Sequence, residues 1–138
     1  MPHEDGAAYY PLVATVSLGA PIVLDLYSKR DADQGEGGES ESVGVGAGMR
    51  RPEFRILQER RSLLITRKKI YTDFLHGIAE TKNDEGLGPE SVCNWDLLRE
   101  KDRFECGSYK RETRVSLTYR DVIKVSRLGN TMKFLGAR

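Results

Sequence analysis

Regular alternation of apolar and polar side chains is the feature that most constrains how this chain folds. Along residues 12–19, one set of alternate positions is apolar: Leu12, Ala14, Val16 and Leu18. The positions between them are small and mostly polar: Val13, Thr15, Ser17 and Gly19. A period of two places these sets on opposite faces of a strand. A strand with one small, polar face suits the wall of a barrel with a wet interior.

Further segments with strand character follow, separated by turns and polar connections. The segments with strand or helical-turn character cover residues 9–19, 21–28, 54–70, 71–80 and 111–126. The first two are expected to meet at residues 19–21 as a hairpin. The segment 71–80 predicts a helical turn that leads into a strand, and 90–104 predicts a helix within a mostly polar connection. Short strands separated by turns predict a mainly β fold, either a jelly roll or a partly open barrel.

One stretch lacks any apolar periodicity. Residues 29–52 are rich in glycine, serine and acidic side chains, a composition typical of disordered segments. The length of 138 residues is that of one domain. We therefore predict one domain over 1–138 that carries a flexible insertion at about 29–52.

Charge is balanced overall but uneven along the chain. There are 22 basic and 21 acidic residues, for a net charge of +1. Eight bases and two acids fall within 50–69, and five bases and one acid within 120–138. These two basic stretches are candidates to contact a phosphate backbone, although a solvated strand face or tail explains them equally well.

Composition also limits the cellular compartments in which the protein is expected. The two cysteines, Cys93 and Cys106, have neither a zinc-ligand spacing nor a disulfide framework. No secretory signal is visible at the start of the sequence. No stretch approaches the roughly 18 apolar residues of a membrane span. A soluble, intracellular protein without a membrane partner is therefore expected.

The two histidines are the first candidates for chemistry. His3 and Asp5 stand two residues apart, so that on an extended segment their side chains project to the same side. With His76 they would supply two imidazoles and a carboxylate, a facial triad that leaves open positions on Fe(II). A chance spacing for His3 and Asp5, and an ordinary half-buried His76, are the alternatives when each motif is considered alone.

A second candidate is the strand of residues 114–120. Arg114, Ser116, Thr118 and Arg120 fall on one face by alternation. Two arginines separated only by small hydroxyl residues describe an anion pocket, because the guanidinium meets a carboxylate bidentately. Two arginines on an exposed strand face are the alternative.

The order of these motifs resembles that of the AlkB family of Fe(II)- and 2-oxoglutarate-dependent dioxygenases. The matching stretches are "MPHEDG", "YYPLVATVSLG", "IVLDLY", "SLLITRKKIYTDFLHGI" and "TRVSLTYR". They share the ordered pattern of His-x-Asp, a distant His, and two Arg with five residues between them. The residues in these stretches are most similar to those of the eukaryotic branch of the sixth AlkB homologue. The resemblance covers nearly the whole chain apart from the glycine-rich and acidic insertion and the connection 81–110.

The resemblance implies a fold and a site. The fold would be a double-stranded β-helix of the jelly-roll or cupin type, and His3, Asp5 and His76 would bind the iron. Arg114 would hold the distal carboxylate of 2-oxoglutarate. Ser116 would line the same pocket. Arg120 would also bind the co-substrate, near its metal-proximal end, and brace Asp5.

The resemblance also implies an activity. With Fe(II), 2-oxoglutarate and dioxygen, the reaction would be oxidative demethylation of alkylated nucleic acid, in the nucleus and cytoplasm. Family members carry further strands and a lid before His-x-Asp, so this domain is expected to be incomplete at its N-terminus. Two alternatives remain open. One is a catalytically inactive remnant that binds nucleic acid or protein, and the other is a dioxygenase acting on a protein or small molecule. The sequence leaves the oligomeric state open.

Overall fold

The computed structural model describes residues 1–29 and 51–124. Nearly all of the predicted insertion, and residues 125–138 of the basic C-terminal stretch, therefore lie outside the described residues. The strands are β1 (Tyr9–Ser17), β2 (Ile22–Ser28), β3 (Phe54–Gln58), β4 (Ser62–Arg67), β5 (Phe74–Gly77), β6 (Asn83–Glu85), β7 (Ser108–Lys110) and β8 (Ser116–Val122). The helical elements are α2 (Lys69–Asp73) and two 3₁₀ turns, η1 (Trp95–Leu97) and η2 (Lys101–Phe104).

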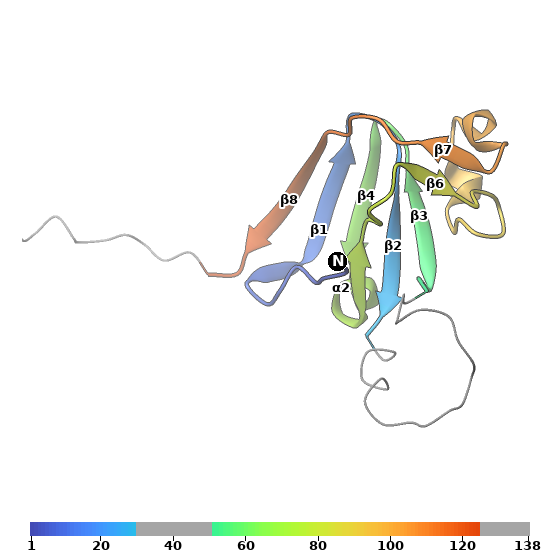
Figure 1. Cartoon of the computed structure of the whole chain (residues 1–138). Helices are drawn as coiled ribbons and strands as arrows, with labels where there is room; N and C mark the ends of the chain where they lie inside the picture. The colour runs from blue at the N-terminus through green and yellow to red at the C-terminus, as the bar shows by residue number, and fades with distance from the viewer. Residues whose placement is uncertain (30–50, 125–138) are drawn as a thin grey trace, which may run out of the picture.

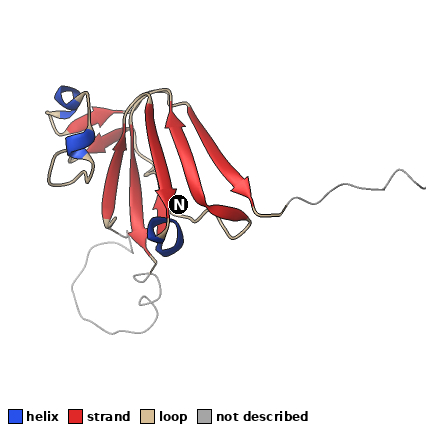
Figure 2. Ribbon diagram, turned by 180° about the vertical axis from the view of Figure 1, so that it is seen from behind, coloured by secondary structure: helices blue, strands red, loops and turns tan. Residues whose placement is uncertain are grey.

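The strands form antiparallel sheets, as predicted for a mainly β, jelly-roll-like fold. Two sheets have three strands each, in the orders β4-β1-β8 and β3-β2-β5. A two-stranded sheet of β6 and β7 stands beside β3 (Figure 1). Figure 2 shows how little helix accompanies these strands. The predicted helical turn before the strand at residues 74–77 is present as α2 and β5.

The predicted hairpin between the first two strands is wrong. β1 and β2 are consecutive in the chain, but they belong to different sheets. The connection pairs instead with the segment before β8: Leu18 N donates to Val115 O at 2.8 Å, and Ala20 N donates to Thr113 O at 3.1 Å. The approach is so close that a Cβ at Gly19 would lie 2.5 Å from the Val115 backbone nitrogen. The turn-like composition at Gly19 therefore marks a crossing between sheets.

β1 presents its polar face to the interior, as its alternation predicts. Val13 and Ser17 are buried, whereas Leu12 and Leu18 on the opposite face are exposed. The neighbouring strands continue this pattern, so the outer face of the β4-β1-β8 sheet also exposes apolar side chains: Leu63, Ile65, Leu117 and Tyr119. The small and mostly polar face of β1 thus points into the space between the two sheets.

The main apolar core lies elsewhere, between β2, β3 and the extension formed by residues 83–110. Its buried members are Val23, Leu57, Leu87, Val92, Leu98 and Phe104. Trp95 and Tyr109 pack against this cluster. The helix predicted over 90–104 is limited to η1 and η2, because side chains tether this segment to the edge of β3. Asn94 exchanges two hydrogen bonds of 2.9 Å with the backbone of Leu57.

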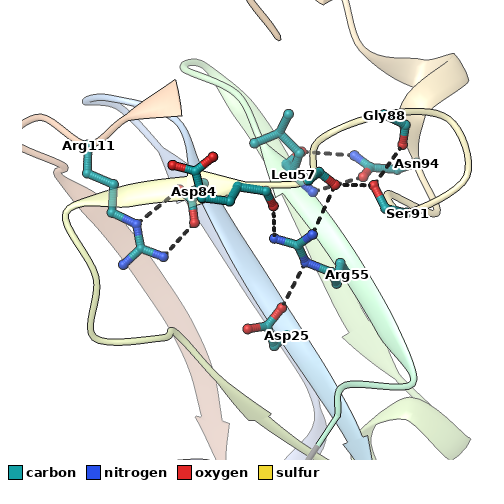
Figure 3. A network of polar contacts seen from close by, with 10 residues as sticks. Asp25, Arg55, Leu57, Asp84, Gly88, Ser91, Asn94 and Arg111 are labelled. Carbon is teal, nitrogen blue, oxygen red and sulfur yellow. Dashed lines mark hydrogen bonds and ion pairs between the residues drawn. The ribbon is translucent and has the colours of Figure 1, made fainter. Parts of the chain in front are cut away.

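A polar network completes the attachment of this extension (Figure 3). Arg55 on β3 donates to the carbonyl oxygens of Glu85 and Gly86 at 3.0 and 3.2 Å. Arg111 donates two hydrogen bonds to the carboxylate of the buried Asp84 of β6, from Nε to Oδ2 at 3.0 Å and from Nη2 to Oδ1 at 2.6 Å. The segment predicted as a polar connection therefore contains the short strands β6 and β7, and Arg55 of β3 holds this extension through the backbone carbonyls of Glu85 and Gly86. In the described part of the chain, no helix is long and apolar enough to cross a membrane.

Candidate functional site

A cavity of about 370 Å³ lies between the two larger sheets. Its walls include all six predicted site residues: His3, Asp5, His76, Arg114, Ser116 and Arg120. Thr118 completes the strand face predicted to point inward, and Val13 and Thr15 of β1 also line the cavity. Residues from both ends of the described chain therefore converge on one enclosed space.

The N-terminal segment is held at this cavity by β5. His3 and His76 form an antiparallel bridge in which each backbone N–H donates to the other's carbonyl at 2.9 Å. The imidazole ring centroids are 4.5 Å apart. Pro2, which precedes His3, packs tightly against β5, since a Cβ added at Gly77 would lie 3.2 Å from the Cα of Pro2. Backbone pairing therefore places together two histidines that are distant in sequence.

His76 is half-buried at the cavity wall. Burial lowers the pKa of His76, and the nearby Asp5 carboxylate partly opposes that shift. Neutral imidazole is the form that ligates a metal ion. The environment of His76 thus favours the form that a metal ligand requires.

Asp5 lines the same cavity, but its carboxylate is paired with an arginine. The Asp5 side chain is 7% exposed, and its Oδ1 lies 2.5 Å from Arg120 Nη2. Arg120 in turn lies over the ring of Tyr9, 5.5 Å from its centroid. Among residues 1–29 and 51–124, no three His, Cys, Asp or Glu side chains are arranged as a ready metal cluster. The structure therefore brings the two histidines together directly and places Asp5 nearby, against Arg120.

The chemistry of this donor set suits a divalent transition metal. Two imidazoles and a carboxylate on one cavity wall are the ligand types that iron, manganese and zinc accept. The pairing of Asp5 with Arg120 resembles the outer contacts that orient ligating carboxylates in metal sites. Binding would require Asp5 to turn one oxygen toward the histidines while Arg120 holds the other.

The other end of the cavity contains Arg114, which precedes β8. Nη1 of Arg114 donates to Ser116 Oγ at 2.9 Å, and Nη2 donates to Ser17 Oγ at 3.2 Å and to Gln58 Oε1 at 3.4 Å. Nε is buried and has no hydrogen-bond partner within the described residues. Burial lowers the pKa of Arg114. The guanidinium is thus a half-buried cation whose hydrogen-bond partners in the described part of the chain are all uncharged.

Two contributors to this end were not predicted as site residues. Ser17 was placed on the polar face of β1, which now proves to face the Arg114 guanidinium. Gln58 ends β3 and is 3% exposed. A single polar residue at the end of an apolar strand carried no local signal of a site, because its partner Arg114 lies 56 residues away in sequence.

Comparison with known proteins supports the resemblance of these motifs. No family model matches the chain. The chain is 35% identical over 132 residues to the zebrafish (Danio rerio) protein "Probable RNA/DNA demethylase ALKBH6". The matched region is 92% of this chain and 49% of the relative, so the chain spans about half the length of that protein.

These similarities and the jelly-roll-like fold agree with the ordered motifs. The similarity to this relative supports placing the chain in the AlkB family, on its ALKBH6-like branch.

Proposed function

We propose that this chain provides the metal- and 2-oxoglutarate-binding part of an AlkB-type dioxygenase that demethylates alkylated nucleic acid. The observation that carries the proposal is the pairing of two features in one cavity. Two neighbouring histidines with a nearby carboxylate lie at one end, and a half-buried arginine with only uncharged partners among the described residues lies at the other. A small dianion with a chelating end would satisfy both.

His3, Asp5 and His76 would hold Fe(II). When bound, Fe(II) would supply the oxidation, with dioxygen and 2-oxoglutarate as co-substrates, that converts an N-methyl group to formaldehyde and an unmethylated base. The chain's own part is to orient the co-substrate and to exclude water. Arg114 would bind the distal carboxylate, while Ser116 would line the pocket beside it.

Arg120 would orient the carboxylate of Asp5, whereas Arg114 would bind the distal carboxylate of the co-substrate. Its guanidinium already pairs with Asp5, so it would fix the direction in which that carboxylate faces. The name of the zebrafish relative, an RNA/DNA demethylase, supports nucleic acid as the substrate class. A dioxygenase of protein or of a small molecule remains the alternative substrate proposal, and location in the nucleus and cytoplasm stays a prediction.

One observation favours a second candidate function. Asp5 is turned to Arg120, and no ready metal cluster occurs among the described residues. A catalytically inactive module would keep the Arg114 pocket and bind a carboxylate-bearing ligand or nucleic acid without metal. Titration of the metal site separates the two candidates.

The test is an anaerobic titration of the 138-residue chain with Fe(II) and 2-oxoglutarate. The proposal expects the visible charge-transfer absorption of a bound Fe(II)–2-oxoglutarate complex. His76→Ala and Arg114→Ala should weaken or abolish this absorption. Arg60→Ala removes an exposed arginine outside the cavity and should leave it unchanged. A folded chain without any such absorption would refute the dioxygenase proposal and favour the metal-free module.

A positive result would then be extended to substrates. Methylated oligonucleotides of DNA and RNA would be incubated with the loaded chain, and released formaldehyde would be measured. Formaldehyde release from an oligonucleotide, lost in His76→Ala, would support nucleic acid demethylation. Turnover of 2-oxoglutarate without release from any oligonucleotide would favour the protein or small-molecule alternative.

A further inference from the structure

Two buried side chains outside the predicted site hold the guanidinium of Arg114. Ser17 is fully buried at the end of β1, and Gln58 is 3% exposed at the end of β3. Both accept hydrogen bonds from Arg114 Nη2. They also contact each other, since Ser17 Oγ donates to Gln58 Oε1 at 3.2 Å. We refer to Ser17 and Gln58 as the polar bracket.

The polar bracket joins the two sheets across one end of the cavity. Ser17 belongs to the β4-β1-β8 sheet and Gln58 to the β3-β2-β5 sheet. The turn between β3 and β4 reinforces this junction, because Arg61 N donates to Ser17 O at 2.6 Å. Rotation of the Arg114 side chain would break its hydrogen bonds to both buried oxygen atoms and leave only the bond between Ser17 and Gln58, which is unfavourable. The bracket therefore fixes the direction in which the guanidinium faces.

The bracket is also uncharged, and this matters for binding. A glutamate at position 58 would have nearly the same shape as glutamine but would neutralise Arg114 from within. The present arrangement leaves the positive charge uncompensated within the described residues and leaves Nε without a partner. An arginine oriented by neutral groups keeps its attraction for an external carboxylate.

We propose that Ser17 and Gln58 are positioning residues. They orient Arg114 toward the distal carboxylate of a 2-oxo dicarboxylate, and their neutrality makes the pocket selective for ligands that end in a carboxylate. The identity of the ligand rests on the proposed function. A purely structural role, in which the bracket only joins the sheets, is the competing explanation.

Selectivity between two ligands distinguishes these roles. 2-Oxoglutarate and 2-oxopentanoate have the same number of carbons, but 2-oxopentanoate has a methyl group in place of the distal carboxylate. Their affinities for the full chain would be measured by calorimetry with Mn(II) present. Gln58→Glu should weaken 2-oxoglutarate binding at least about tenfold, because the new carboxylate competes for the guanidinium. The affinity for 2-oxopentanoate should change less than about twofold, because this ligand lacks the distal carboxylate that would contact Arg114.

A second pair of variants guards against misfolding of Gln58→Glu. Ser17→Ala and Gln58→Met remove bracket contacts without adding charge. Each should lower the affinity for 2-oxoglutarate by roughly three- to tenfold and leave that for 2-oxopentanoate nearly unchanged. Asn83→Asp adds the same charge on an exposed residue of β6 and should alter neither affinity. If the bracket variants weaken both ligands equally, or neither, the positioning role is refuted.

The experiment also separates this inference from the proposed function. If the unaltered chain binds no 2-oxoglutarate, the proposed function fails. If it binds the ligand and Arg114→Ala abolishes binding while the bracket variants do not affect it, only the positioning role fails.

Discussion

The two arginines that line the cavity differ in what surrounds their charge. Arg120 pairs with Asp5 at 2.5 Å, while Arg114 contacts only hydroxyl and amide oxygens among the described residues. They stand on one face of the same segment with five residues between them. An arginine already paired inside the protein supports structure, whereas one that is half-buried and uncompensated attracts a ligand. Position on the strand therefore says less about function than the partner does.

The polar network of the extension shows the paired case in its most buried form. Arg111 and Asp84 have side chains only 12% and 3% exposed, and their two hydrogen bonds are bidentate (Figure 3). A buried pair of this kind is weak evidence for added stability, but loss of one partner leaves a bare buried charge. The contrast between Arg111, Arg120 and Arg114 yields a graded set of expectations.

The largest effect is expected for Arg111→Met. This change leaves the Asp84 carboxylate buried without its cation, which should lower the free energy of unfolding by about 3–5 kcal/mol. Urea denaturation followed by circular dichroism measures this loss. The double variant Arg111→Met with Asp84→Asn should recover much of it. A single variant as stable as the unaltered chain would show that Asp84 does not depend on this pair.

Arg114→Ala should weaken ligand binding, whereas Arg111→Met should lower the stability of the fold. The affinity for 2-oxoglutarate with Mn(II) should fall roughly 100-fold, because charge-assisted hydrogen bonds are each worth about 1.5–3 kcal/mol. Calorimetry measures this, with Arg60→Ala as the control. The comparison would break if Arg114→Ala lost stability in urea but kept its affinity, since Arg114 would then be a structural arginine.

Arg120→Met tests the intermediate case. Asp5 would lose its partner, but Arg120 is 34% exposed, so water can replace part of the contact. The free energy of unfolding should fall by about 1–2 kcal/mol. Direct affinity for 2-oxopentanoate and 2-oxoglutarate should change in parallel, in contrast to Arg114→Ala. A selective loss of 2-oxoglutarate alone would mean that Arg120 binds the distal carboxylate.

Local alternation predicted much of this arrangement. It identified the inward polar face of β1 and the face of residues 114–120 that lines the cavity, because a strand's side-chain period depends only on the strand itself. The order of motifs predicted that His3, Asp5 and His76 share one site, and all three line the cavity. Their role in binding a metal stays a prediction.

Long-range pairing limited the rest. The hairpin at Gly19 failed because residues 18–20 pair with residues 113–115, a choice that no local pattern encodes. Gln58 was missed for the same reason, since its significance depends on Arg114. The helix over 90–104 gave way to short 3₁₀ turns because Asn94 and Glu59 fix that segment to β3. Such tertiary contacts override local propensity.

The smallest effect should come from Asp25, a carboxylate that is neither well paired nor free. Its Oδ1 lies 3.5 Å from Arg55 Nε, too far for a strong hydrogen bond. Burial raises the pKa of Asp25, Asp84 adds to the shift, and Arg55 and Arg111 oppose it. A raised carboxyl pKa means that the folded state holds its proton more tightly than the unfolded state. Stability should therefore fall as pH rises from the ordinary value of 3.8 to the raised one.

Asp25→Asn should flatten this decline. Because Arg55 would also lose a partner, we expect the change at neutral pH to be under about 1 kcal/mol. Urea denaturation at a series of pH values, with the unaltered chain in parallel, measures the slope. Asp121→Asn, at an exposed position of β8, is the matched control and should keep the unaltered slope. If Asp25→Asn instead steepened the loss of stability with rising pH, Asp25 would be a properly paired carboxylate. The distinction between compensated and uncompensated charges would then have to be redrawn at this position.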